Sequence, residues 1–102
     1  MDFVNVKDIV QANMLAMESE ISNQVFNVGT GISTTIKELA EILISSVGEK
    51  VIPEFSGEKS IVQQRRADIT KIKKMLNFKP TIDVNRGLKE VVKEIRKNED
   101  EY

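Results

Sequence analysis

The spacing of the apolar residues changes repeatedly along this chain, and this change limits the folds that the chain can adopt. Residues 3–6, 25–28 and 51–55 are short β-prone runs, whereas Ile36, Leu39 and Leu43 have helical spacing. The whole pattern predicts the order β-α-β-α-β-loop-α-α, with no internal repeat. We therefore expect a small α+β unit with short strands, about four helices and no complete doubly wound sheet.

Several helix boundaries are marked by capping residues. Thr35 and Glu38 form a capping-box pair before the second helix, and Gly48 is a typical C-terminal stop. Asp83 is a good N-cap for the last helix. The stretch from Asn77 to Pro80 should end the third helix, because proline disfavours helical backbone at the residue before it.

The first helix is expected to carry one apolar stripe, made of Ile9, Val10, Met14 and Met17. Asp8 lies in its first turn, where a negative charge suits the helix dipole. A second interpretation of Asp8 remains open, in which its carboxylate positions a loop or another domain.

The chain has 102 residues, of which 40% are apolar, and this suits one small domain. We expect that domain to span residues 1–97, with residues 98–102 as a frayed acidic tail. Fifteen basic and sixteen acidic residues give a net charge of −1, which argues against a basic nucleic-acid binder. No apolar run is long enough for a membrane span. Cysteine and histidine are absent, so we expect no metal site and a cytoplasmic location.

A glycine loop, VGTGIST at residues 28–34, allows three interpretations. It resembles the start of a dinucleotide fingerprint, but Thr34 replaces the third glycine. It could instead be a turn with positive φ before a capped helix, which is the interpretation that we favour. In the third, the loop amides and Asn27 line a pocket that another domain completes.

A second motif, QQRRADI at residues 63–69, contains two adjacent arginines. Guanidinium groups offer paired donors and a permanent charge, so Arg65 and Arg66 could clamp a diphosphate. The alternative is a solvated basic turn, which is the interpretation that these residues alone favour. No catalytic group accompanies them: the only tyrosine is Tyr102, so no Tyr-x-x-x-Lys pair exists, and no base is available to activate a serine.

Four stretches together resemble the C-terminal region of the extended short-chain dehydrogenase/reductase family. In that family the NAD-dependent epimerases and dehydratases act on nucleotide-diphospho-sugars. The stretches are DFVNVKDIVQA (2–12), VFNVGTG (25–31), RADITKI continuing to LNFKP (66–80), and Gly87-Leu88 before an amphipathic helix. Their order and spacing cover the chain to about Lys97, and the 4-epimerases that act on UDP-sugars are the most similar members.

The resemblance implies a substrate-binding lobe, with NAD and the catalytic residues on a Rossmann domain that this chain lacks. The chain alone would then hold neither a cofactor nor a catalytic residue, and would be inactive. The family's asparagine falls on Asn27, and Arg65 falls in a segment that contacts the diphosphate in many members. Two departures weaken the diphosphate contacts: Met1 stands where members have arginine, and residues 58–61 replace an Arg-x-Gly-Asp turn.

Two alternatives stay open. The chain could be a free-standing, non-catalytic binding or assembly module, or the same lobe of a sugar 4,6-dehydratase or decarboxylase. The nucleotide and the sugar are not determined by these residues. A lobe without its partner domain should also expose apolar surface at the stripe of the first helix and near Phe55, and we expect self-association through it.

Overall fold

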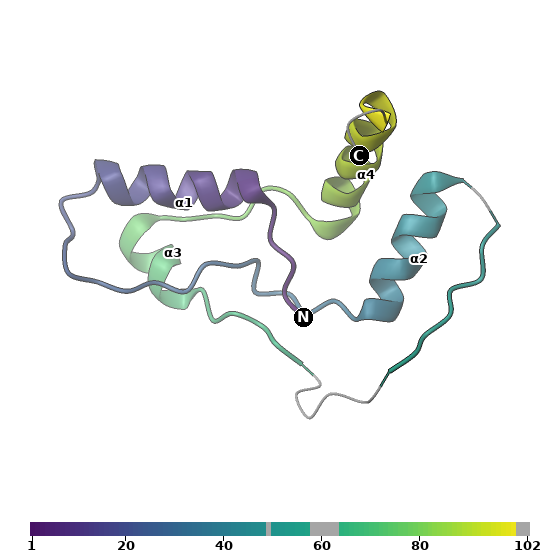
Figure 1. Cartoon of the computed structure of the whole chain (residues 1–102). Coiled ribbons are helices and arrows are strands. Elements are labelled where there is room, and N and C mark those ends of the chain that lie inside the picture. Colours follow the sequence, from purple (N-terminus) through teal and green to yellow (C-terminus); the bar gives the residue numbers. More distant parts are fainter. Residues whose placement is uncertain (49, 58–63, 100–102) are drawn as a thin grey trace.

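The computed structural model describes residues 1–48, 50–57 and 64–99. Within these residues the chain forms four helices (Figure 1): α1 Val6–Glu18, α2 Ile36–Val47, α3 Thr70–Leu76 and α4 Val84–Lys97. α1 packs against α3, and α2 packs against α4. Long extended segments join these two helix pairs, so residues far apart in the sequence meet between them.

The apolar core lies between α1, α3 and the extended segments beside them. Its buried members are Ala12, Ile69, Ile72, Leu76 and Phe78, and the half-buried Leu15, Phe26, Val28 and Ala67 pack around them. By contrast, no residue of α2 is fully buried, and the only fully buried residue of α4 is Gly87. The α1·α3 half therefore holds most of the chain's buried apolar surface.

The prediction of short strands is wrong for the described residues, which contain helices and extended backbone but no strand. Residues 25–28 and 51–55 are extended without a ladder, and residues 3–6 run into α1. Met1 and Thr34 do exchange backbone hydrogen bonds, from Thr34 N to Met1 O at 2.8 Å and from Met1 N to Thr34 O at 3.0 Å. This pairing does not continue, because the next contacts across these segments are made by the Asp2 side chain instead. The fold is therefore helical with extended connections, and it contains no complete Rossmann fold.

The predicted caps of α2 and α4 are confirmed. Thr35 Oγ1 accepts a hydrogen bond from Glu38 N at 3.0 Å, and Gly48 ends α2 with φ of 80°. Asp83 Oδ1 accepts from Arg86 N at 2.8 Å at the start of α4. These caps depend only on residues close in sequence, which is why the sequence predicts them well.

The predicted end of α3, in the stretch from Asn77 to Pro80, is confirmed, but Pro80 is not what ends the helix. The helix ends at Leu76, and Asn77 follows it in the left-handed conformation with φ of 54°. Asparagine tolerates this conformation better than most residues. The stop therefore occurs before Pro80 can act. Of the predicted tail at 98–102, only residues 98 and 99 are described, and Asn98 is the C-cap of α4.

Candidate functional site

The carboxylate of Asp2 joins the N-terminal segment to two distant loops. It accepts hydrogen bonds from Thr30 N at 3.0 Å and from the Thr30 hydroxyl. It also accepts from Gly31 N at 2.9 Å and from Ala67 N at 3.3 Å. One half-buried carboxylate therefore holds the glycine loop against the segment that leads into α3.

Burial and hydrogen bonding act on Asp2 in opposite directions. Partial burial disfavours the charged form and by itself raises the pKa of the carboxyl group. The hydrogen bonds from Thr30, Gly31 and Ala67 favour the carboxylate, and together they bring the pKa of Asp2 below its ordinary value of 3.8. Asp2 is therefore charged at neutral pH while it makes these contacts.

Gly29 and Gly31 meet two different needs in this loop. A Cβ atom at Gly29 would lie 2.7 Å from Asp2 Oδ2 and 2.8 Å from Ala67 Cβ, so the close approach of the segments leaves no room for a side chain. Gly31 has φ of 76°, which glycine adopts without strain. The turn with positive φ is thus confirmed at Gly31, whereas Gly29 is needed for space.

The glycine loop does not fit a dinucleotide. The amides of Thr30 and Gly31 already donate to Asp2, and Ile32 N donates to Thr30 Oγ1 at 3.1 Å. A pyrophosphate would need such amides free, and here it would meet a carboxylate instead. The dinucleotide interpretation therefore does not fit this loop. The third interpretation stays a prediction: Thr30, Gly31 and Ile32 line a hollow, although the Thr30 and Gly31 amides already donate to Asp2.

The three site residues predicted from the sequence come together on one surface. Asn27, Arg65 and Arg66 are exposed, and all three line a broad, open hollow of about 720 Å³. Asp2, Phe26 and Ala67 are also part of its lining. The hollow thus lies directly over the Asp2 hydrogen bonds, which position the two segments that supply its polar groups.

Arg66 also lines a second hollow, of about 620 Å³, together with Asp68 and Lys73. Asp68 Oδ1 accepts hydrogen bonds from the Thr70 hydroxyl at 2.6 Å and from Thr70 N at 3.0 Å. These bonds lower the pKa of Asp68, and the positive charge of Arg66 lowers it further. The backbone that follows Arg66 is therefore fixed at two points, by Asp2 at Ala67 and by Asp68 at the start of α3.

Asp8 is the counterpart of Asp2 on the opposite side of the core. Only 1% of it is exposed, and it accepts hydrogen bonds from Thr81 N at 3.1 Å, Thr81 Oγ1 at 2.9 Å and Ile82 N at 3.1 Å. The neighbouring Gln11 exchanges two further bonds with the backbone of Lys79. The structure thus favours the second interpretation of Asp8: its carboxylate positions the loop between α3 and α4.

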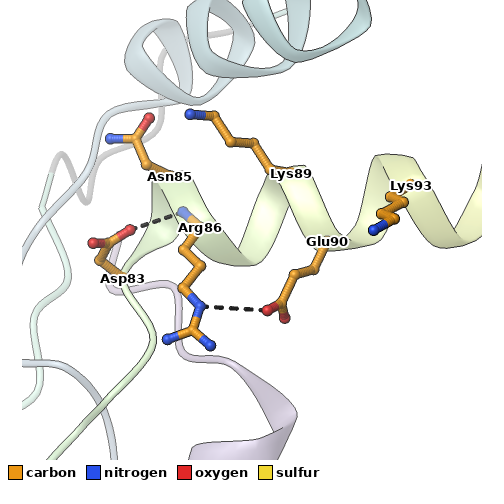
Figure 2. A pocket seen from close by; sticks show the side chains of 6 residues that line it. All are labelled: Asp83, Asn85, Arg86, Lys89, Glu90 and Lys93. Atoms are coloured by element: carbon orange, nitrogen blue, oxygen red, sulfur yellow. Dashed lines mark hydrogen bonds and ion pairs between the residues drawn. The ribbon is translucent and has the colours of Figure 1, made fainter.

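Another hollow, of about 430 Å³, lies along the first turns of α4 (Figure 2). Three of its six lining residues are engaged within the chain: Arg86 N donates to Asp83 at 2.8 Å, and Arg86 Nε lies 3.4 Å from Glu90 Oε1. Figure 2 shows Arg86 turned toward Glu90 along the helix surface, with Lys89 on the other side. The hollow is therefore a gap between long, exposed side chains, and we do not regard it as a ligand site.

Asp2 is the functional residue that sequence reasoning missed. It stands at the start of the DFVNVKD stretch and precedes Asp8 by six positions, so both acids were visible in the sequence. Their partners lie 28 to 74 residues away, and nothing in the motifs that contain Thr30 and Ala67 indicates a pairing with Asp2. The only available signal was that each partner loop contains a threonine whose amide and hydroxyl can bind one carboxylate.

Neither of two other site types is found in the described part of the chain. Across residues 1–48, 50–57 and 64–99, no cluster of three acidic, histidine or cysteine side chains could hold a metal ion. In the same residues, no helix has the length and apolar character needed to cross a membrane. The hollow that Asn27, Arg65 and Arg66 line is the arrangement that calls for a functional explanation.

No family model matches the chain, but individual proteins do. The solved structure of UDP-glucose 4-epimerase from Thermotoga maritima with UDP-glucose is 39% identical, with a TM-score of 0.85, over 94% of this chain and 31% of that one. UDP-glucose 4-epimerase of Mycolicibacterium smegmatis is 31% identical over 93% of this chain and 31% of its own length. UDP-N-acetyl-alpha-D-glucosaminuronate decarboxylase of Bacillus cytotoxicus is 28% identical over 97% of this chain and 33% of its length. The chain therefore spans about one third of these relatives.

Proposed function

We propose that this chain binds the nucleotide-diphosphate end of a nucleotide-sugar. The chain is homologous to nucleotide-sugar epimerases and related extended short-chain dehydrogenases/reductases, and it matches about one third of their length. Asn27, Arg65 and Arg66 are the proposed contacts. Their presence on one hollow is the observation that carries the proposal, because residues from two distant segments converge there.

The chemistry of the hollow supports a diphosphate as the ligand. Two guanidinium groups can each offer paired donors to phosphate oxygens, and both arginines are exposed. The Asp2 carboxylate lies in the same lining, but its oxygens already accept four donor groups from the protein, which moderates its repulsion of an anion. Asn27 adds an amide that can donate to and accept from a nucleotide base or ribose.

The proposed parent activity is an NAD-dependent 4-epimerase, in which this chain corresponds to the C-terminal, substrate-binding lobe. NAD would supply hydride transfer at the sugar from a Rossmann domain outside this chain. The residues of this chain would bind and orient the diphosphate and help to exclude water from it. We accordingly expect no turnover by the isolated chain.

Two other parent reactions fit the same lobe. One solved relative of lower identity is a dTDP-glucose 4,6-dehydratase, and the Bacillus cytotoxicus relative is a decarboxylase. These reactions would be distinguished by residues of the Rossmann domain, so the lobe itself would serve each of them. A free-standing binding module is the other candidate, and it predicts the same ligand with tighter binding.

A titration with UDP and UDP-glucose, followed by NMR of the ¹⁵N-labelled chain, tests the proposal. We expect saturable shifts at the Asn27 side-chain amide and at the amides of Arg65 and Arg66. A dissociation constant on the order of 1 mM is expected, because only part of the pocket wall is present. Tight binding, near 1 µM, would favour the free-standing module instead.

The matched variants are Arg66→Ala and Arg86→Ala. Both remove an exposed arginine, but Arg86 lies on α4, outside the hollow. We expect Arg66→Ala to weaken UDP binding about tenfold, equivalent to one charge-assisted contact, and Arg86→Ala to leave it unchanged. Equal effects of both variants, or shifts confined to α4, would disprove the assignment of the hollow.

A further inference from the structure

The extended segment at residues 25–28 carries Asn27 to the edge of the hollow, and its position needs an explanation. Within the described part of the chain these residues form no ladder with another segment. The side chains of Phe26 and Val28 pack around the core, whereas Asn27 is exposed. The hydrogen bonds that hold a strand in a sheet therefore do not fix the place of Asn27.

Lys71, the second residue of α3, makes a polar contact with this segment. Its Nζ donates a hydrogen bond of 2.9 Å to the Val25 carbonyl, 46 residues away in the sequence. Across residues 1–48, 50–57 and 64–99, this is the one hydrogen bond that the structure shows to the backbone of residues 25–28. The same ammonium group lies 5.1 Å from the centre of the Phe26 ring, within the range of a cation–π contact. The segment passes beside α3 at this point (Figure 1).

Lys71 and Asp2 hold the same stretch of chain at its two ends. Lys71 binds the carbonyl of Val25, and the Asp2 carboxylate binds the amide of Thr30. Asn27 lies between these two points. Asp2 also accepts a hydrogen bond from the segment that leads into α3, and Lys71 belongs to α3 itself. The stretch with Asn27 is thus held at both ends against the part of the chain that carries the two arginines.

The effect of the Lys71 contact is local, because Lys71 is exposed. Water can replace either partner, so the bond contributes little to the stability of the whole fold. It still restricts where the segment lies, since a charge-assisted hydrogen bond is short and directional. The contact therefore bears mainly on the geometry of the segment that carries Asn27.

We propose that Lys71 is a positioning residue of the hollow, which holds Asn27 in place for the ligand. This inference rests on the proposed binding of a nucleotide-diphosphate. Lys71 is not among the described residues that line the hollow, whereas Phe26 and Asn27 are. Lys71 acts through the Val25 carbonyl and the Phe26 ring, and its own ammonium group does not touch the ligand.

Spectra of the ¹⁵N-labelled chain without ligand test the contact itself. Lys71→Met keeps an unbranched side chain and the helix propensity but removes the donor and the charge. The Phe26 amide shares a peptide group with the Val25 carbonyl, so its ¹⁵N shift reports the loss of the bond. We expect this shift to change much more in Lys71→Met than in Lys74→Met, which removes another exposed lysine of α3. Equal changes in both variants would overturn the contact.

UDP titrations of the same variants test the effect on binding. Lys71→Met should weaken UDP binding about three- to fivefold, as expected for one lost hydrogen bond. Lys71→Arg keeps a charged donor and should bind within about twofold of the wild type. Lys74→Met is the matched control for the loss of one positive charge on α3, and it should leave the affinity unchanged. Binding by Lys71→Met equal to that of the wild type would overturn the proposal.

A double-mutant cycle with Asn27 separates positioning from a long-range effect of charge. In an Asn27→Ala background, Lys71→Met should lose most of its effect, because the group that Lys71 positions is gone. An attraction between the Lys71 charge and the diphosphate would instead weaken binding equally in both backgrounds. That result would overturn the role of Lys71 and leave the proposed function intact. A wild type without any UDP response would overturn the proposed function, and the role of Lys71 in binding with it.

Discussion

Asp2 and Asp8 make nearly the same set of hydrogen bonds in two different environments. Each carboxylate accepts hydrogen bonds from the amide and hydroxyl of one threonine and from the amide of the next residue. For Asp2 these residues are Thr30 and Gly31, and for Asp8 they are Thr81 and Ile82. Asp8 is 1% exposed at the edge of the core, whereas Asp2 is half-buried beneath an open hollow.

The difference in burial changes what the same bonds do. Around Asp8, water cannot replace a lost acceptor, so its bonds contribute mainly to the stability of the fold. Around Asp2, water can reach part of the group, so its bonds matter more for where the glycine loop and the arginine segment lie. The comparison shows that one local motif can serve stability in one place and the geometry of a site in another.

The largest expected effect is the loss of Asp8. Asp8→Ala should lower the free energy of unfolding by about 3 kcal/mol, because it leaves buried amides without an acceptor. Asp2→Ala should cost only about half as much, since water can replace part of what is lost. Urea unfolding followed by circular dichroism measures both values.

If Asp8→Ala does not fold, Asp8→Asn provides the graded version, because it keeps one acceptor oxygen. The comparison between the two aspartates would fail if the Asp2 variant were as unstable as the matching Asp8 variant. It would also fail if the UDP response of the Arg66 amide were altered by Asp8→Asn and not by Asp2→Asn.

An intermediate effect on stability is expected at Gly29, and it tests whether the Asp2 side chain lies as close to this glycine as the structure indicates. Gly29→Ala should destabilise the chain by about 2 kcal/mol, because its Cβ would lie 2.7 Å from Asp2 Oδ2 and 2.8 Å from Ala67 Cβ. Gly48→Ala has open space around its Cβ and should cost only the roughly 1 kcal/mol of left-handed backbone strain.

A double-mutant cycle then separates the two contacts of Gly29. In an Asp2→Ala background, the cost of Gly29→Ala should fall, since one of the two clashing groups is gone. An unchanged cost would mean that Ala67 alone accounts for the lack of space, and that the Asp2 side chain is not held as described.

The smallest expected effect is the pH dependence that Asp2 adds. Its pKa is below 3.8 in the folded chain, so its contribution is fully present above the ordinary pKa and is lost as the pH falls through the lower, folded value. The stability difference between wild type and Asp2→Asn should therefore be constant at neutral pH and shrink below about pH 3.8. Because Asp2 is partly solvated, we expect a change of less than about 1 kcal/mol. Urea unfolding of both proteins across this range measures it, and a difference that grew on acidification would contradict the sign.

The helices were predictable because their signals are local. Thr35, Gly48 and Asp83 each act on residues within one turn, and the structure confirms their roles. The strand predictions failed because a β-prone run becomes a strand only when a second segment forms backbone hydrogen bonds along it. Residues 25–28 instead lie extended, and the Val25 carbonyl accepts from Lys71 Nζ at 2.9 Å.

The residues alone suggested Asn27 and the two arginines as separate possibilities, and only the family resemblance linked them in one site. Asn27 is far from Arg65 and Arg66 in the sequence, and no periodicity links them. The structure brings all three to one hollow, which the order of the motifs had suggested. Asp2 was missed because its role depends on amides of two distant loops, and such long-range contacts have no short sequence signature.

The sequence distance between Asp8 and Ile82, 74 residues, has a consequence for the biosynthesis of this chain. At translation rates of about 5–20 residues per second, roughly 4 to 15 seconds pass between the synthesis of the carboxylate and that of its last partner. During this interval α1 can form, but neither the Asp8 bonds nor the contacts with α3 can close. The face of α1 that later packs against α3 is exposed to chaperones during this interval, until the second half of the chain has been synthesised.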